Sequence, residues 1–134
     1  MSVRIVTTGG VLAWDGPCKT FNRWRNALAA RAGYTSGPQP PPFQDWERVT
    51  INWLQFSDVN LYGRWEIPPE DILMVLLCHY ATQGHIEPGH AAPLADRLVA
   101  LSPPPEDDPW HGRTETFIAA LRSAAASNQP IEFM

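Results

Sequence analysis

The sequence predicts an α+β domain that is mostly helical, with about four helices and a small β element formed by its N- and C-terminal segments. Short β-branched segments stand near both ends of the chain, and apolar residues recur at helical spacing in the stretches between them. A chain of 134 residues has the length of one domain and can bury a core without disulfides or metal. We therefore expect residues 1–134 to form a single domain.

The β element is predicted from three short segments. Residues 3–7 and 11–14 have the composition of strands, and the Gly9-Gly10 pair between them is typical of a turn. Residues 130–133 have the composition of an edge strand that returns to this N-terminal pair.

The first helix is expected to begin at Asp15-Gly16-Pro17 and to end at Gly33. Its apolar side chains recur at positions i, i+3, i+7 and i+11, namely Phe21, Trp24, Leu28 and Ala32. Three basic side chains lie largely off this stripe and predict a basic outer face: Lys19, Arg23 and Arg25.

The middle of the chain contains a predicted loop and a segment whose pattern fits two kinds of secondary structure. Residues 35–43 have the composition of a polyproline loop. In residues 45–56 the apolar positions alternate as in a strand and also fall on one helical face, so both structures stay open. The β-branched run at 49–51 favours a strand over the middle of this segment.

Three further helices are predicted in the second half. The first begins at residues 68–71, where prolines and acids favour a helix start, and is apolar on nearly all sides from 72 to 79. The second begins at Pro93 and ends within residues 102–109. The third begins at Asp108-Pro109, and its apolar side consists of Phe117, Ile118, Leu121 and Ala125.

Residues 79–90 have the length and skeleton of a calcium-binding EF-hand loop between two of these helices. Gly84 occupies the sixth position, where such a loop turns sharply, and Ile86 occupies the eighth. At the ligand positions only Gln83 and Glu87 offer side-chain oxygens, which cannot replace the hydration shell of a calcium ion. We therefore expect a degenerate EF-hand-like helix-loop-helix that binds no calcium.

Short motifs spread over residues 50–134 also carry a resemblance. They are Trp53-Leu54-Gln55-Phe56, Gly63-Arg64-Trp65, Pro69-Glu70-Asp71, Cys78-His79, Gly84-His85-Ile86, residues 92–98, Phe117-Ile118, Leu121-Arg122 and Ile131-Glu132-Phe133. In these motifs the chain resembles a family of small uncharacterised bacterial proteins, found mainly in actinobacteria. Its members typically read His-Ser-Asp-Cys-Asp-Gly where this chain has residues 79–84. The resemblance implies a fold and a loop that has lost two acids, but no activity.

Histidine and cysteine side chains in residues 78–90 raise the alternative of a zinc or copper site. In an EF-hand-like turn, His79 and His90 would converge at the first and last ligand positions. The spacing matches no structural zinc motif, and helix capping is the favoured interpretation of these histidines. His79 and His90 are thus the candidate metal ligands, in a protein expected to hold no cofactor.

Catalytic motifs are absent from the sequence. It contains no nucleophile elbow, no glycine-rich phosphate loop, no His-Glu-x-x-His and no Cys-x-x-Cys. His111 is more often a helix cap than a general base in such a position. Trp65 and Trp110 precede helices and are candidates for an exposed partner surface, although most tryptophans in so small a chain belong to the core.

Charge is unevenly distributed along the chain. Residues 1–43 hold five basic groups and one acid, a balance of +4, whereas residues 44–134 hold five basic groups and thirteen acids, a balance of −8. The favoured interpretation is that the two parts pack against each other; the alternative is a basic face for a polyanion. The N-terminus lacks a signal-peptide pattern and the longest apolar run, 72–78, is too short to span a membrane, so we expect a cytoplasmic protein.

Three functional hypotheses follow. The leading one is a non-catalytic protein-interaction module built on the helix-loop-helix, with Trp65, Trp110, Arg23 and Arg25 as candidate surface residues. The second is a small enzyme or ligand-binding protein that uses a tryptophan-lined pocket with His79 or His90. The third, which we expect least, is nucleic-acid binding through Arg23, Arg25 and Arg31 of the first helix.

Overall fold

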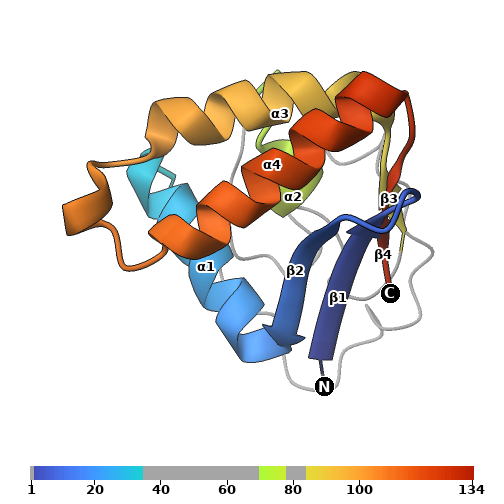
Figure 1. The fold of residues 1–134 in the computed structure, drawn as a ribbon. Helices are drawn as coiled ribbons and strands as arrows, with labels where there is room; N and C mark the ends of the chain where they lie inside the picture. Colours follow the sequence, from blue (N-terminus) through green and yellow to red (C-terminus); the bar gives the residue numbers. More distant parts are fainter. Residues whose placement is uncertain (1, 35–69, 78–83) are drawn as a thin grey trace, which may run out of the picture.

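A computed structural model describes residues 2–34, 70–77 and 84–134. These residues form four α-helices and one four-stranded antiparallel sheet (Figure 1), which confirms the predicted mostly helical α+β fold. The predictions for residues 35–43 and 45–56 fall outside the described residues. No helix in the described part is both long enough and apolar enough to cross a membrane.

The sheet is built from strands β1 (Ser2–Thr7), β2 (Leu12–Pro17), β3 (His85–Ile86) and β4 (Ile131–Phe133), in the order β2-β1-β4-β3. The two strand-like segments predicted near the N-terminus pair as a hairpin, with Gly10 at a φ of +88° in its turn. The position of β4 corrects the prediction of an edge strand, because β4 pairs with β1 on one side and with β3 on the other.

Helix α1 (Cys18–Arg31) follows β2 directly. Asp15-Gly16-Pro17, predicted as a helix start, is the last part of β2, since Gly16 pairs with Val3 across the hairpin. The predicted end is confirmed: Gly33 has a φ of +84°, and the chain leaves the helix at this residue.

The remaining helices are α2 (Met74–Leu77), α3 (Pro88–Leu101) and α4 (His111–Ser127), with a short 3-10 turn, η3 (Pro105–Asp107), between the last two. Helix α3 begins at Pro88 and not at Pro93, because proline without an N–H group is well suited to the first helical position. Helix α4 begins at His111, two residues later than its predicted first turn, and ends at Asn128 in the left-handed conformation.

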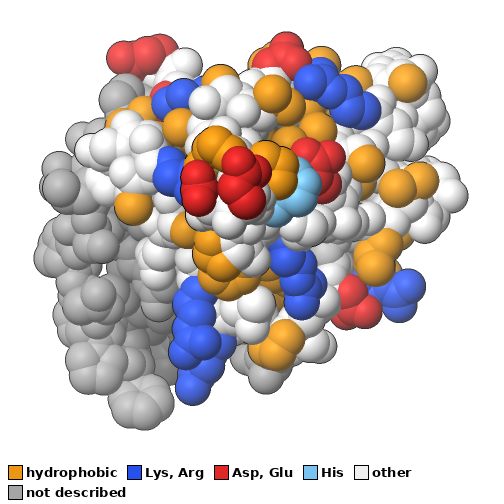
Figure 2. All heavy atoms as spheres, turned by 60° about the vertical axis from the view of Figure 1, so that its left-hand side comes forward, with side chains coloured by type: hydrophobic (Ala, Val, Ile, Leu, Met, Phe, Trp, Pro, Cys, Tyr) orange, Lys and Arg blue, Asp and Glu red, His pale blue; other side chains and the backbone are white. Residues whose placement is uncertain are grey.

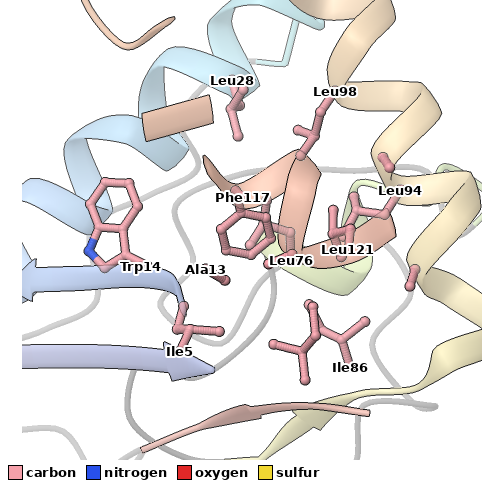
Figure 3. Close-up of a cluster of buried hydrophobic side chains, with 14 of the residues drawn as sticks. Ile5, Ala13, Trp14, Leu28, Leu76, Ile86, Leu94, Leu98, Phe117 and Leu121 are labelled. Atoms are coloured by element: carbon pink, nitrogen blue, oxygen red, sulfur yellow. The ribbon is translucent and has the colours of Figure 1, made fainter. Parts of the chain in front are cut away.

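The helices lie on one face of the sheet, and the core fills the space between them (Figures 1 and 3). Along β1, Val3 and Ile5 are buried while Arg4 between them is exposed, as expected when one face of a strand packs on the core. Figure 3 shows that Ile5, near the start of the chain, belongs to the same buried cluster as Ile86 and Phe117 from its second half.

An aromatic cluster forms the part of the core beneath α1. The ring of Trp24 stacks on that of Trp14 with centroids 5.0 Å apart, and its other neighbours include Phe117, also at 5.0 Å. Phe21 meets Trp14 edge-on at 5.2 Å. These contacts explain why Trp14 and Trp24, at 1% and 0% exposure, belong to the core rather than to a surface.

Candidate functional site

Two features of the predicted EF-hand-like loop fall within the described residues. Gly84 has a φ of +93°, as a sharp turn at this position requires. Ile86 is buried in β3, opposite Ile131 of β4. His90 lies in the first turn of α3, half-buried, whereas His79 lies outside the described residues.

Metal binding by this loop therefore stays a prediction. Over residues 2–34, 70–77 and 84–134, no three His, Cys, Asp or Glu side chains are grouped as metal ligands would be. His85 is the seventh residue of the predicted loop, and its Nε2 atom is 2.6 Å from Oε1 of Glu87, in an exposed pair.

Arg25 is wrong as a candidate surface residue, because its side chain is fully buried. Its Nη1 atom donates to the carbonyl oxygens of Leu76 and Leu77, at 3.3 and 3.4 Å, where α2 ends. A helix end leaves such carbonyls without partners inside the helix, and Arg25 provides them. Its guanidinium also lies 4.7 Å from the ring centroid of Phe21.

The spacing explains why this assignment failed. Arg25 follows Phe21 by four residues and precedes Leu28 by three, so it lies on the apolar stripe itself. Of the predicted basic face, Lys19 and Arg23 are exposed.

The other predicted surface residues are placed as follows. Trp65 lies outside the described residues. Trp110 is half-buried against the core, and its backbone N–H donates to Oδ1 of Asp108 at 2.8 Å, just before α4 begins. Arg31 is bound to the same carboxylate, Nη2 to Oδ1 at 2.6 Å, so it is not available to a polyanion. This pair joins the basic first part of the chain to the acidic second part.

A second polar cluster joins the end of α1 to α2 and α3. The hydroxyl of Tyr34 donates to Oδ2 of Asp71, and Arg97 donates to both oxygens of that carboxylate at 3.3 and 3.1 Å. Partial burial alone would raise the pKa of Asp71, but the hydrogen bonds from Arg97, Tyr34 and the backbone N–H of Leu73 hold this pKa below its ordinary value. Burial and the bond to Asp71 raise the pKa of Tyr34.

Several basic side chains are thus paired with a carboxylate in the described part of the chain, and others are not. Arg122 also has a partner, Asp96, at 2.8 Å. Four others have no carboxylate partner within the described residues: Arg4, Lys19, Arg23 and Arg113. Lys19 and Arg23 lie on the exposed side of α1, and Arg113 of α4 reaches the end of β2 through its bond to Asp15. We call the group Trp14, Gly16, Lys19, Arg23 and Arg113 the β2–α1 corner.

Arg113 of α4 contacts two parts of the end of β2. Its guanidinium lies over the indole of Trp14, 4.4 Å from the ring centroid, and its Nη1 atom donates to the backbone oxygen of Asp15 at 2.7 Å. Lys19 and Arg23 are exposed on α1 one turn apart. Figure 2, in which the left-hand side of Figure 1 comes forward, shows basic side chains below an acidic group near the middle of the view.

The electrostatics of α1 reinforce this positive region. A helix N-terminus carries a partial positive charge that acidic residues or a capping side chain normally offset. Helix α1 has no acid in its first turn and no side-chain cap, and Lys19 adds a positive charge there. Asp15 is exposed on the face of β2 opposite Trp14, where its neighbour in the strand register is Arg4.

The indole N–H of Trp14 is the most unusual group of the corner. The residue is 1% exposed, and its Nε1 atom has no hydrogen-bond partner among the described residues. The indole N–H of Trp24, by contrast, donates to Oγ1 of Thr114 at 2.9 Å. An unsatisfied buried donor costs about 1–3 kcal/mol, so such groups are rare in native interiors.

Several donors converge on Gly16. A Cβ atom built on Gly16 would lie 3.4 and 3.5 Å from the two terminal nitrogens of Arg113, and 3.6 Å from Nε1 of Trp14. In Figure 3 this nitrogen is on the side of the ring that faces the end of β2. The guanidinium of Arg113 and the indole N–H of Trp14 therefore lie beside each other, next to the same backbone position.

Sequence reasoning missed most of this site. The sequence predicts Gly16 as part of a helix start and Trp14 as part of a strand. Arg113 was not considered, since only the fold brings α4 to β2. The available signal was the first turn of α1, which has Lys19 and no acid.

No protein-family model, curated protein or solved structure matches this chain. The family resemblance described above therefore stays a prediction.

Proposed function

We propose that the protein is an interaction module that binds an acidic segment of a partner protein through the β2–α1 corner. The observation that supports this proposal is that, in the part of the chain that the structure describes, some basic side chains have a carboxylate partner and others do not. Arg31, Arg97 and Arg122 are paired with carboxylates, whereas Lys19, Arg23 and Arg113 at the corner have none among the described residues. Such cations attract a complementary charge from outside.

A protein partner is favoured over nucleic acid. A stable complex with duplex DNA commonly involves about 6–10 phosphate contacts, more than three cations provide. The net charge of −4 also opposes a long polyanion. Arg25 and Arg31, which completed the predicted nucleic-acid face, bind groups within the protein.

Site-specific photo-crosslinking in cells of the source organism tests this function. A photoreactive residue at exposed Asn26 lies on the same stripe of α1 as Lys19 and Arg23. We expect a discrete protein adduct that is lost in the double variant Lys19→Glu, Arg23→Glu. The matched control, Arg122→Glu, reverses an exposed charge on α4 and should leave the adduct intact.

Three results would argue against the proposal. One is an adduct that persists after both charges are reversed. Another is the same adduct from a photoreactive residue at exposed Glu115 on α4. A third is crosslinking of Asn26 to nucleic acid instead of protein.

A further inference from the structure

We propose that the β2–α1 corner is a binding site for a phosphate-type oxoanion, such as a phosphate monoester. This inference deepens the proposed function, since it names the group that the acidic partner presents. Only the identity of the carrier rests on that function; the site itself is argued from the corner.

The first element of the site is the N-terminus of α1. This helix is 14 residues long, and within the described residues no side chain accepts a hydrogen bond from the N–H groups of its first turn. Such N–H groups, together with the helix dipole, favour bound anions. Lys19 in this turn adds a mobile ammonium group on the exposed side.

The second element is independent of the helix. The indole N–H of Trp14 is buried, has no partner among the described residues and faces the end of β2, where α1 begins. A buried donor left in this state would be satisfied by an acceptor that enters from outside. Its distance of 3.6 Å from the Cβ position of Gly16 places it beside the same point as the guanidinium of Arg113.

Arg113 both covers and completes the site. It is half-exposed, and the bond from Nη1 to the backbone of Asp15 leaves Nη2 available. A rotation of this side chain uncovers Nε1 of Trp14 and directs the guanidinium at an anion. Arginine suits this role because its donors match the spacing of phosphate oxygens.

The number of donors favours phosphate over carboxylate. A phosphate monoester carries nearly two negative charges at neutral pH and about three strong acceptor oxygens. It can therefore accept hydrogen bonds from more of these donors at once than a carboxylate can. A planar carboxylate has about two acceptor oxygens and a single charge to offer the same donors.

Titration of the full chain with inorganic phosphate, at constant ionic strength and followed by ¹⁵N NMR, tests the site. The six tryptophans give six indole signals, and the variant Trp14→Phe identifies that of Trp14. We expect this signal and the amides of Cys18 and Lys19 to shift in a saturable way. The indole of Trp24 should not move, because it is bound to Thr114.

Two variants show whether the response belongs to the corner. Arg113→Met keeps contact with the Trp14 ring but should weaken phosphate binding about tenfold or more, since a charge-assisted hydrogen bond is lost. Gly16→Ala should abolish binding, because a methyl group there makes ordinary contacts of 3.4–3.6 Å and fills the point where the donors meet. Arg122→Met, on the same helix α4, should bind phosphate as the unmodified protein does.

The oxoanion site is refuted if the Trp14 signal stays in place at high phosphate, or if Arg113→Met and Gly16→Ala bind normally. An equal response to acetate would also refute the phosphate-type assignment. Tighter binding of O-phosphoserine than of inorganic phosphate supports a phosphorylated side chain as the source, and equal binding supports the free ion.

The two proposals can fail separately. If charge reversal removes the Asn26 adduct but phosphate has no effect, the interaction module stands without the oxoanion site. If phosphate binds at Trp14 but no charge-dependent adduct forms, the site stands and the proposed function fails.

Discussion

The buried hydrogen bond between Trp24 and Thr114 should be a measurable part of the stability of this fold. Both residues are at most 1% exposed, and the bond joins residues 90 positions apart, at 2.9 Å. Thr114→Val keeps the shape of the side chain and removes the acceptor. The indole N–H then remains buried without a partner, which costs about 1–3 kcal/mol of unfolding free energy.

Urea denaturation followed by circular dichroism measures this cost directly. Thermal unfolding gives a second measure: in a domain of this size about 1 kcal/mol corresponds to roughly 3–4 °C in Tm, so we expect Tm to fall by about 3–12 °C. Thr114→Ser is the control that keeps the hydroxyl and removes a methyl group, which costs about 1 kcal/mol.

A double-mutant cycle with Trp24→Phe separates the bond from other effects. Phenylalanine has no N–H to satisfy, so in that background Thr114→Val should be neutral or stabilising. An equal loss of stability from Thr114→Val in both backgrounds would show that the hydrogen bond contributes nothing specific.

Two further predictions concern the pH dependence of stability and the backbone. The folded state lowers the pKa of Asp71 below its ordinary value of 3.8. The stabilisation from this carboxylate is therefore present above pH 3.8 and is lost as the pH falls through the lower folded pKa. When the free energy of unfolding is measured as a function of pH, it should decline less steeply on the acid side for Asp71→Asn than for the unmodified protein. A decline identical to that of the unmodified protein would contradict this role. Gly33→Ala should lower the free energy of unfolding by about 1 kcal/mol, because φ at this position is +84° and no neighbour lies within 4 Å to add a clash. The control Gly112→Ala in α4 should be neutral or slightly stabilising. Equal effects of the two substitutions on the denaturation midpoint would rule out backbone strain at Gly33.

Local patterns predicted much of the fold. The hairpin, the end of α1 at Gly33 and the apolar sides of α1 and α4 depend on turn chemistry and helical spacing, which neighbouring residues determine. Errors occurred where distant residues decide. Residues 15–17 look like a helix start, but pairing of Gly16 with Val3 keeps them in a strand. The interior place of β4 depends on β3, which no local pattern indicated.

The candidate site was predicted only in part. Lys19 and Arg23 were correctly placed on an outer face, because the period of a helix determines it. Arg25 has the same chemical type, but its position on the apolar stripe buries it. The contribution of Arg113 requires α4 to pack beside β2, and the lone indole N–H of Trp14 follows from packing that no spacing reveals.

The interior position of β4 also bears on how fast the protein folds. Ile5 pairs with Phe133, so nearly the whole length of the chain must close into a loop before the two halves of the sheet are joined. The entropy of closing such a loop is about 4 kcal/mol. The β1–β2 hairpin and β3 can therefore join into one sheet only after this contact has formed, and diffusion of the unfolded chain forms it rarely. Folding limited by such contacts proceeds over milliseconds to seconds rather than microseconds.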